Sequence, residues 1–260
     1  MQNTVRVKVH EASGTIVLDR PEKRNALTRW SITQLREALH DLHQERRVRA
    51  VILTGAGTAF CAGMDLSEMR ETAAEEDAWE QWYQDAVQYK DLLETMLRFP
   101  KPIIAAVNGA AVAGGAGLVL AADIVVGCSG ASFGFPEPRR GLVAGLVAPL
   151  LTFRIGGGMA ANMLLTGQLI DAERALQIGV YHQLVPHEQL WAQAHEIAGQ
   201  CAECAPESLQ LTKRLLNETI GEHLETMLSA GAAASATSRT TEAAIEGLSA
   251  FLEKRLPQWR

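Results

Sequence analysis

The sequence predicts an α/β fold, because runs typical of buried strands alternate with segments that carry apolar residues at helical spacing. Residues 30–43 and 77–98 show the helical spacing most clearly. Helices between strands imply crossover connections. The strand-like runs are residues 5–9, 15–18, 50–54, 102–107, 123–126 and 180–185.

The end of the chain has a different pattern. From about His187 onward the strand signals stop, and alanine-rich helical patterns follow over residues 189–201, 206–221, 222–236 and 240–254. A late helical block of this kind forms either a second lobe or a surface that packs on other copies of the chain. We therefore divide the chain into a core of residues 1–195 and a C-terminal helical oligomerisation region of residues 196–260.

The bulk composition is that of a soluble globular protein, with 260 residues, of which 47 % are apolar and 21 % charged. A net charge of −6 leaves no basic surplus to neutralise phosphates, so we expect no nucleic-acid partner. No apolar run is long enough to span a bilayer, and the N-terminus alternates like a strand rather than a signal peptide. We expect a cytoplasmic protein that does not contact a membrane.

The cysteines and histidines give no sign of a metal site or a nucleophilic triad. Cys201 and Cys204 have the spacing of a redox or metal pair, but no second pair follows at zinc spacing. None of the seven histidines lies in a recognisable Ser or Cys partner motif. We expect buried or incidental thiols, also at Cys61 and Cys128, and no metal ligand.

Two glycine-rich segments each follow a strand-like run and precede a helical pattern. Gly63 precedes Met64 and Asp65 after the run 50–54, and Gly114 precedes the helical residues 115–122 after the run 102–107. A helix N-terminus exposes unpaired N–H groups. We predict that the amides of Met64 and Gly114 form an oxyanion hole, although a tight packing corner at Gly114 explains that glycine about equally well.

Glu137 is the candidate acid or base. Prolines flank it on both sides, and Pro138 favours an extended backbone at Glu137. Burial near apolar neighbours such as Phe133 would raise the pKa of the carboxyl and suit it to proton transfer near neutral pH. The alternative is a salt bridge to Arg139 or Arg140.

Together these segments resemble the crotonase superfamily, the enoyl-CoA hydratase/isomerase family. The motifs lie at residues 18–27, 60–66, 108–118, 133–141 and 246–255, and the resemblance covers nearly the whole chain. It implies a crotonase-like spiral of ββα units with a C-terminal helical trimerisation region, in a homotrimer or a dimer of trimers. It also implies an acyl-CoA thioester as substrate, so coenzyme A is part of the substrate and no separate cofactor is needed.

Matching motif positions implies a role for individual residues. The amides of Met64 and Gly114 would hold the thioester oxygen, and Glu137 would exchange protons with the acyl carbons. The resemblance places Lys23 and Arg24 at the CoA phosphates, Ala62, Asp65 and Leu66 along the adenine strip, and Phe251 and Lys254 beside CoA, in many members from a neighbouring chain.

The chain departs from typical hydratases at position 117, where they carry a first glutamate and this chain has Gly117. Gly117 stands one helical turn after Gly114, so we expect a side chain there to face the pocket, and glycine to leave room and remove a base. Residues 143–150, after Glu137, also depart from the usual pattern. Both departures resemble a methylglutaconyl-CoA hydratase-like subgroup.

We therefore predict an enoyl-CoA hydratase that adds water to 2-enoyl-CoA by syn addition, in fatty-acid or branched-chain catabolism. A single-glutamate enoyl-CoA Δ-isomerase, in which Glu137 moves a proton between C2 and C4, stays open, as do decarboxylation, dehalogenation and retro-aldol cleavage. From another class, the chain could be a catalytically weak acyl-CoA-binding subunit. The prolines that hold Glu137 speak against that last alternative.

Overall fold

A six-stranded sheet forms one side of the core. The computed structural model describes residues 3–219 and 223–259. The strand order is β1-β2-β3-β5-β7-β10, with β1 and β2 antiparallel and the other neighbours parallel. The parallel strands β3, β5 and β7 are mostly buried and rich in Val, Ile and Ala, as expected of strands covered on both faces. These strands are β1 (Val5–His10), β2 (Ser13–Leu18), β3 (Ala50–Gly55), β5 (Ile103–Val107), β7 (Ile124–Cys128) and β10 (Gln183–Val185).

A second sheet of four short strands completes the spiral. It contains β4 (Ala59–Cys61), β6 (Ala110–Val112), β8 (Ser132–Gly134) and β9 (Leu169–Asp171). Successive passes of the chain, β3–β4, β5–β6 and β7–β8, each give one strand to each sheet and then turn into a helix. This arrangement is the predicted spiral of ββα units. The four short strands themselves were not predicted.

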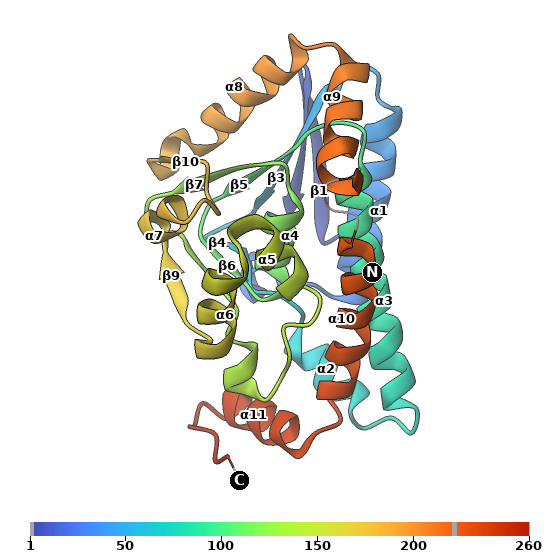
Figure 1. The fold of residues 1–260 in the computed structure, drawn as a ribbon, viewed down its shortest axis with the longest axis vertical. Helices are drawn as coiled ribbons and strands as arrows, with labels where there is room; N and C mark the ends of the chain where they lie inside the picture. The colour runs from blue at the N-terminus through green and yellow to red at the C-terminus, as the bar shows by residue number, and fades with distance from the viewer. Residues whose placement is uncertain (1–2, 220–222, 260) are drawn as a thin grey trace.

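Helices cover the sheets. The helix α8 (Leu190–Ala202) packs on β2, β3, β5 and β7, whereas α1 (Arg29–Gln44) packs on β1 and β2 and lies beside α3 (Ala78–Arg98) (Figure 1). Among the described residues, no helix is both long and apolar enough to cross a membrane. The remaining helices of the core are η1 (Pro21–Lys23), α2 (Leu66–Thr72), α4 (Gly114–Ala121), η2 (Glu137–Arg140), α5 (Ala148–Ile155), α6 (Gly157–Thr166), α7 (Ala172–Gln177) and η3 (His187–Gln189).

The C-terminal helices pack on the core. They are α9 (Pro206–Arg214), a π-helical segment (Leu215–Thr219), α10 (Leu224–Ser238) and α11 (Glu242–Leu252). The predicted junction at residues 221 and 222 lies outside the described residues. The predicted boundary after residue 195 falls inside α8, a continuous helix that packs on the large sheet. Figure 1 shows α10 along α3 and α11 across the lower end of the molecule.

Candidate active site

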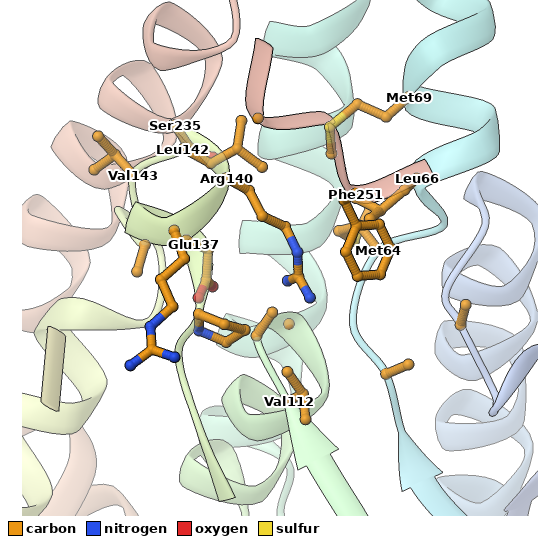
Figure 2. Close-up of a pocket in the computed structure, with 18 of the residues that line it drawn as sticks. Met64, Leu66, Met69, Val112, Glu137, Arg140, Leu142, Val143, Ser235 and Phe251 are labelled. Atoms are coloured by element: carbon orange, nitrogen blue, oxygen red, sulfur yellow. The ribbon is translucent and has the colours of Figure 1, made fainter. Parts of the chain in front are cut away.

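A cavity of about 600 Å³ is lined by residues of η1, α2, α3, α4, η2, α10 and α11. Glu137 and Arg140 point into it from one turn of chain, with Met64 and Phe251 on a facing wall (Figure 2). The cavity therefore brings together residues predicted from segments far apart in the sequence. The predicted site residues in its lining are Lys23, Arg24, Ala62, Met64, Leu66, Gly114, Glu137 and Phe251.

The close approach of Gly63 to the start of α4 brings the two predicted amides together. Gly63 has a φ of +88°, and a Cβ at this position would lie 2.9 Å from the Val112 carbonyl oxygen and 3.1 Å from the Gly114 nitrogen. Only glycine allows this conformation and this contact without strain. The peptide that follows Gly63 carries the Met64 N–H, which therefore lies beside the N-terminus of α4.

Both amides are free to donate. Leu27 pairs with this segment, because its N–H donates to the Gly63 oxygen at 2.8 Å and its oxygen accepts from the Asp65 N–H at 2.8 Å. This pairing skips the Met64 N–H. Gly114 is the first residue of α4, where an N–H has no partner in the helix. Among the described residues, neither amide finds an acceptor, so the cavity wall holds two unpaired donors.

Asn25 fixes the segment that leads to Met64. Its side chain is 2 % exposed, and its amide nitrogen donates to the carbonyl oxygens of Ala56 at 2.9 Å and Ala59 at 2.8 Å. Its side-chain oxygen accepts from the Arg20 N–H at 2.9 Å. In the sequence, Asn25 stands out only as part of the motif at residues 18–27. The structure shows that its hydrogen bonds connect the loop after β2, at Arg20, to Ala59 in β4.

Glu137 starts a 3-10 helix, so the prediction of an extended backbone at this residue was wrong. The Arg139 N–H donates to the Pro136 oxygen at 3.1 Å, and the Leu142 N–H donates to the Glu137 oxygen at 3.0 Å. Pro138 fits into this turn because a first-turn N–H has no partner to lose. The turn, rather than an extended strand, fixes the direction of the carboxyl.

The carboxyl of Glu137 has the predicted electrostatic character. Its Oε2 atom is buried and has no hydrogen-bond partner. Burial raises the pKa of Glu137 to about 7, although a hydrogen bond from its own backbone N–H and the charge of Arg140 act in the opposite direction. Within the described chain it forms no salt bridge: Arg139 donates to the Thr166 oxygen, and Arg140 lies 4.3 Å over the Phe251 ring. The carboxyl can exchange a proton near neutral pH.

Comparison with known proteins decides the family. Residues 9–260 match the family described as enoyl-CoA hydratase/isomerase. The chain belongs to this family. It is 40 % identical over 247 residues to a putative enoyl-CoA hydratase of Thermus thermophilus, covering 94 % of this chain and 96 % of that protein.

A second relative and a solved structure agree. A short-chain-enoyl-CoA hydratase of Clostridium acetobutylicum is 31 % identical, covering 97 % of this chain and 96 % of that one. The crystal structure of an enoyl-CoA hydratase/isomerase from Xanthobacter autotrophicus Py2 superposes with a TM-score of 0.89 at 29 % identity, over 98 % of this chain and 95 % of that chain. The predicted crotonase fold is therefore confirmed.

Position 117 is where this member of the family departs from the hydratase pattern given above, and the structure corrects our prediction there. A Cβ on Gly117 would lie 2.3 Å from the Tyr89 hydroxyl and 2.7 Å from Val147 Cγ1, so this glycine does not leave room. The buried Tyr89 hydroxyl, which fills the space, donates to the Gly114 carbonyl oxygen. Burial raises the pKa of Tyr89 well above its ordinary value, so it is a neutral donor. No local signal in α3 predicts this role.

Two residues that were predicted to contact CoA lie outside the cavity lining, whereas Arg140, which was not predicted to contact it, lies in that lining. Asp65 does not line the cavity in the described chain; it is buried, caps α2 by accepting from the Ser67 N–H, and pairs with Arg20 at 3.0 Å. Lys254 follows α11 with a φ of 56° and also lies outside the cavity lining of its own chain. Arg140, which we predicted only as a salt-bridge partner, lines the cavity instead, close to the charges of Glu137 and Arg24.

The described residues hold no disulfide, and Cys61 and Cys128 are buried thiols, as expected. Burial raises the pKa of the Cys61 thiol to about 12. One group with possible metal ligands, His10, Glu11 and His195, has its ligand atoms within 4.8 Å of one another on the outer side of β1 and α8, away from the cavity. The cavity itself offers main-chain amides and the carboxyl of Glu137 for chemistry, since the carboxyl of Asp85, which also lines it, is paired with Arg29.

Proposed function

We propose that the protein is an enoyl-CoA hydratase, which adds water across the 2,3 double bond of an acyl-CoA thioester. The observation that carries this proposal is one cavity wall with two unpaired amides, at Met64 and Gly114, and a buried carboxyl, Glu137, whose pKa is about 7. Family membership supports the same reaction class. The thioester oxygen is the group that two preorganised donors suit.

In this proposal, one carboxyl makes both proton transfers. The ionised Glu137 takes a proton from water as the water oxygen bonds to C3, and the electron pair of the double bond moves onto the thioester oxygen. The amides of Met64 and Gly114 hold this enolate oxygen, and each is worth about 3–4 kcal/mol of barrier by analogy with measured oxyanion holes. The protonated Glu137 then gives its proton to C2 and is ionised again. Since both transfers use the same carboxyl, water adds to one face of the double bond.

The CoA moiety supplies binding energy away from the reacting carbons. Lys23, Arg24 and Arg140 are cations of the cavity lining that would bind the CoA phosphates, since arginine binds phosphate through paired hydrogen bonds. Ala62 and Leu66 would lie along the adenine. Asp65 would act there indirectly, because it caps the helix that begins at Leu66.

A single-glutamate isomerase is the second candidate. The absence of a carboxyl at Gly117, with a neutral tyrosine in its place, favours it because double-bond migration needs only one base. In that reaction Glu137 removes a proton from one of the carbons C2 and C4 and returns it to the other, with the same amides on the enolate oxygen.

Assays with 2-enoyl-CoA and 3-enoyl-CoA in water enriched in oxygen-18 separate the candidates. Loss of thioester conjugation with labelled oxygen at C3 is the expected result. Conversion of 3-enoyl-CoA to 2-enoyl-CoA without label would support the isomerase. Glu137→Gln should abolish either activity, whereas Glu207→Gln, an exposed carboxyl outside the cavity, should not. Absence of turnover with retained CoA-thioester binding would instead favour an acyl-CoA-binding subunit.

Assembly and location are part of the proposal. A homotrimer or a dimer of trimers would give Phe251 and Lys254 a place near the CoA of a neighbouring chain, and we place the activity in the cytoplasm. Analytical ultracentrifugation tests the assembly, and a monomer at catalytic concentration would contradict it. Fractionation of source cells tests the location, and recovery outside the cytoplasm would contradict it.

A further inference from the structure

Arg239 is a buried cation without a partner. It is 7 % exposed, follows α10 as its C-terminal cap, and lines the cavity. Within the described part of the chain, its guanidinium makes no hydrogen bond and no ion pair. Buried charges are normally paired, because a lone charge loses its hydration without compensation. The Arg239 guanidinium therefore has no paired anion to compensate for the hydration that it loses on burial.

The one carboxylate near Arg239 is already engaged. The nearest charges to Arg239 are Asp85 and Arg29. Asp85 accepts from Arg29 Nε at 2.6 Å and from Arg29 Nη2 at 2.9 Å, and Gln81 donates to it at 2.8 Å. Arg29, which also lies near Glu68 and Glu75, therefore engages both carboxylate oxygens of Asp85, and among the described residues no carboxylate forms an ion pair with Arg239. Burial lowers the pKa of Arg239 to about 10, which still leaves it protonated at neutral pH.

The C-terminal end of α10 does not supply a hydrogen-bond acceptor for the Arg239 guanidinium. The C-terminus of α10 carries a partial negative charge, which favours a cation at Arg239. No helix carbonyl, however, accepts a hydrogen bond from its side chain within the described residues. A guanidinium presents a planar fork of N–H groups that matches a carboxylate in geometry and charge.

Different charges act on Arg140 and on Arg239. Those that shift the pKa of Arg140 are Glu137 and Arg24, whereas those that shift the pKa of Arg239 are Asp85 and Arg29. Asp85 precedes Tyr89 by one turn of α3, about 6 Å along the axis, and the Tyr89 hydroxyl contacts Gly114. Arg239 is therefore near the acyl end of the site, a short distance beyond the oxyanion donors.

We propose that Arg239 binds the terminal carboxylate of a short acyl group, so that the preferred substrates are CoA monothioesters of dicarboxylic acids. This inference rests on the proposed function, because it assigns the far end of the same site. It follows from one juxtaposition: a buried, unpaired guanidinium on the wall of the cavity that holds the two amides and Glu137.

The first test compares two substrates of equal carbon number. One is 2-hexenoyl-CoA, and the other is the CoA monothioester of 2-hexenedioic acid, in which a carboxylate replaces the terminal methyl group. We expect a higher kcat/KM for the acid, and a fall of this preference on the order of 10- to 100-fold in Arg239→Gln, as for a hydrogen-bonded charge. Arg239→Lys should keep part of the preference.

Arg46→Gln is the matched control for this test, since it removes an exposed guanidinium outside the cavity and should leave the preference unchanged. Equal kcat/KM for both substrates in the wild type would overturn the proposal. So would an equal loss for both substrates in Arg239→Gln, because that result would assign Arg239 to the fold or to the chemistry.

The second test needs no turnover and so separates this inference from the proposed function. Calorimetry measures binding of hexanoyl-CoA and of the CoA monothioester of hexanedioic acid. We expect the wild type to bind the acid more tightly and Arg239→Gln to bind both equally. If neither enoyl substrate reacts but this difference holds, the hydratase proposal fails and the carboxylate site stands. If hydration proceeds but both saturated ligands bind the wild type equally, the carboxylate site is refuted.

The stability of the free protein gives a third readout. Arg239→Met keeps much of the side-chain volume and removes an unpaired buried charge, so the ligand-free variant should resist urea at least as well as the wild type. A clear loss of stability would mean that the guanidinium holds the fold together, and it would overturn the proposal.

Discussion

Replacement of Glu137 by glutamine should make the protein progressively more stable than the wild type as the pH rises. The carboxyl has an ordinary pKa of 4.5, and its burial in the folded cavity raises this pKa to about 7. At 1.36 kcal/mol for each pH unit between these values, the two proteins should separate by about 3 kcal/mol. Glutamine has nearly the same shape but no proton to lose.

The sign of the effect follows from which state holds the proton. Between pH 4.5 and about 7 the unfolded chain has released the proton of Glu137, whereas the folded chain still holds it. A rise in pH therefore favours unfolding. The contribution of the neutral carboxyl to stability is complete below pH 4.5 and is lost as the pH rises through about 7. Glutamine contributes a constant offset, so only the pH-dependent part of the difference is diagnostic.

Urea unfolding at one fixed protein concentration, from pH 4.5 to 8.5, measures this difference. Other titrating groups are common to both proteins and cancel, and Glu207→Gln should track the wild type at every pH. A difference between Glu137→Gln and the wild type that is flat with pH, or that has the opposite sign, would refute the reasoning. Such a result would mean that the carboxyl is hydrated or paired with a cation in solution.

Three further predictions concern the same site. Gly117→Ala should lower the free energy of unfolding by about 1–3 kcal/mol, because the new methyl group meets the Tyr89 hydroxyl. This loss should be smaller in a Tyr89→Phe background, and additive effects in the double-mutant cycle would contradict the prediction. The value of kcat/KM should fall about tenfold per pH unit below the pKa of Glu137, because only the ionised carboxyl accepts a proton. A kcat/KM that does not change with pH in this range would exclude Glu137 as the base. Asn25→Ala should lower the free energy of unfolding, measured in urea, by about 3 kcal/mol, because the hydrogen bonds to Ala56 and Ala59 are lost. It should also lower kcat, because the loop before Met64 is then less firmly held, and an unchanged kcat would contradict this expectation.

The strands of the large sheet could be predicted from the sequence, whereas the short strands of the second sheet could not. The runs at β3, β5 and β7 are five or six residues of buried apolar side chains, which is enough to mark a strand. The strands β4, β6 and β8 have three residues each, too few for any repeat to show. They nevertheless matter, because the chain leaves them directly toward Met64, Gly114 and Glu137.

The residues of the candidate site also fall into those that the sequence predicts and those that it does not. Met64, Gly114 and Glu137 lie at the start of a helix or just before one, where glycine or proline interrupts an apolar run, and this interruption is visible in the sequence. Tyr89 and Arg239 belong to helices with ordinary amphipathic or alanine-rich patterns. Their roles depend on α10 lying along α3 and on what each side chain meets there, which a local pattern does not contain.

In the proposed hydration, the glycine at position 117 explains why one carboxyl would serve for both proton transfers. A glutamate side chain at Gly117 would compete with Tyr89 for the same space, and the tyrosine hydroxyl is committed to the carbonyl of Gly114. That bond holds the residue whose N–H faces the substrate oxygen, so Tyr89 positions the oxyanion donor rather than the water. Since Tyr89 stays neutral, it cannot serve as the second base. The proton that Glu137 takes from water is then the one available for C2, and addition to a single face of the double bond follows from the geometry.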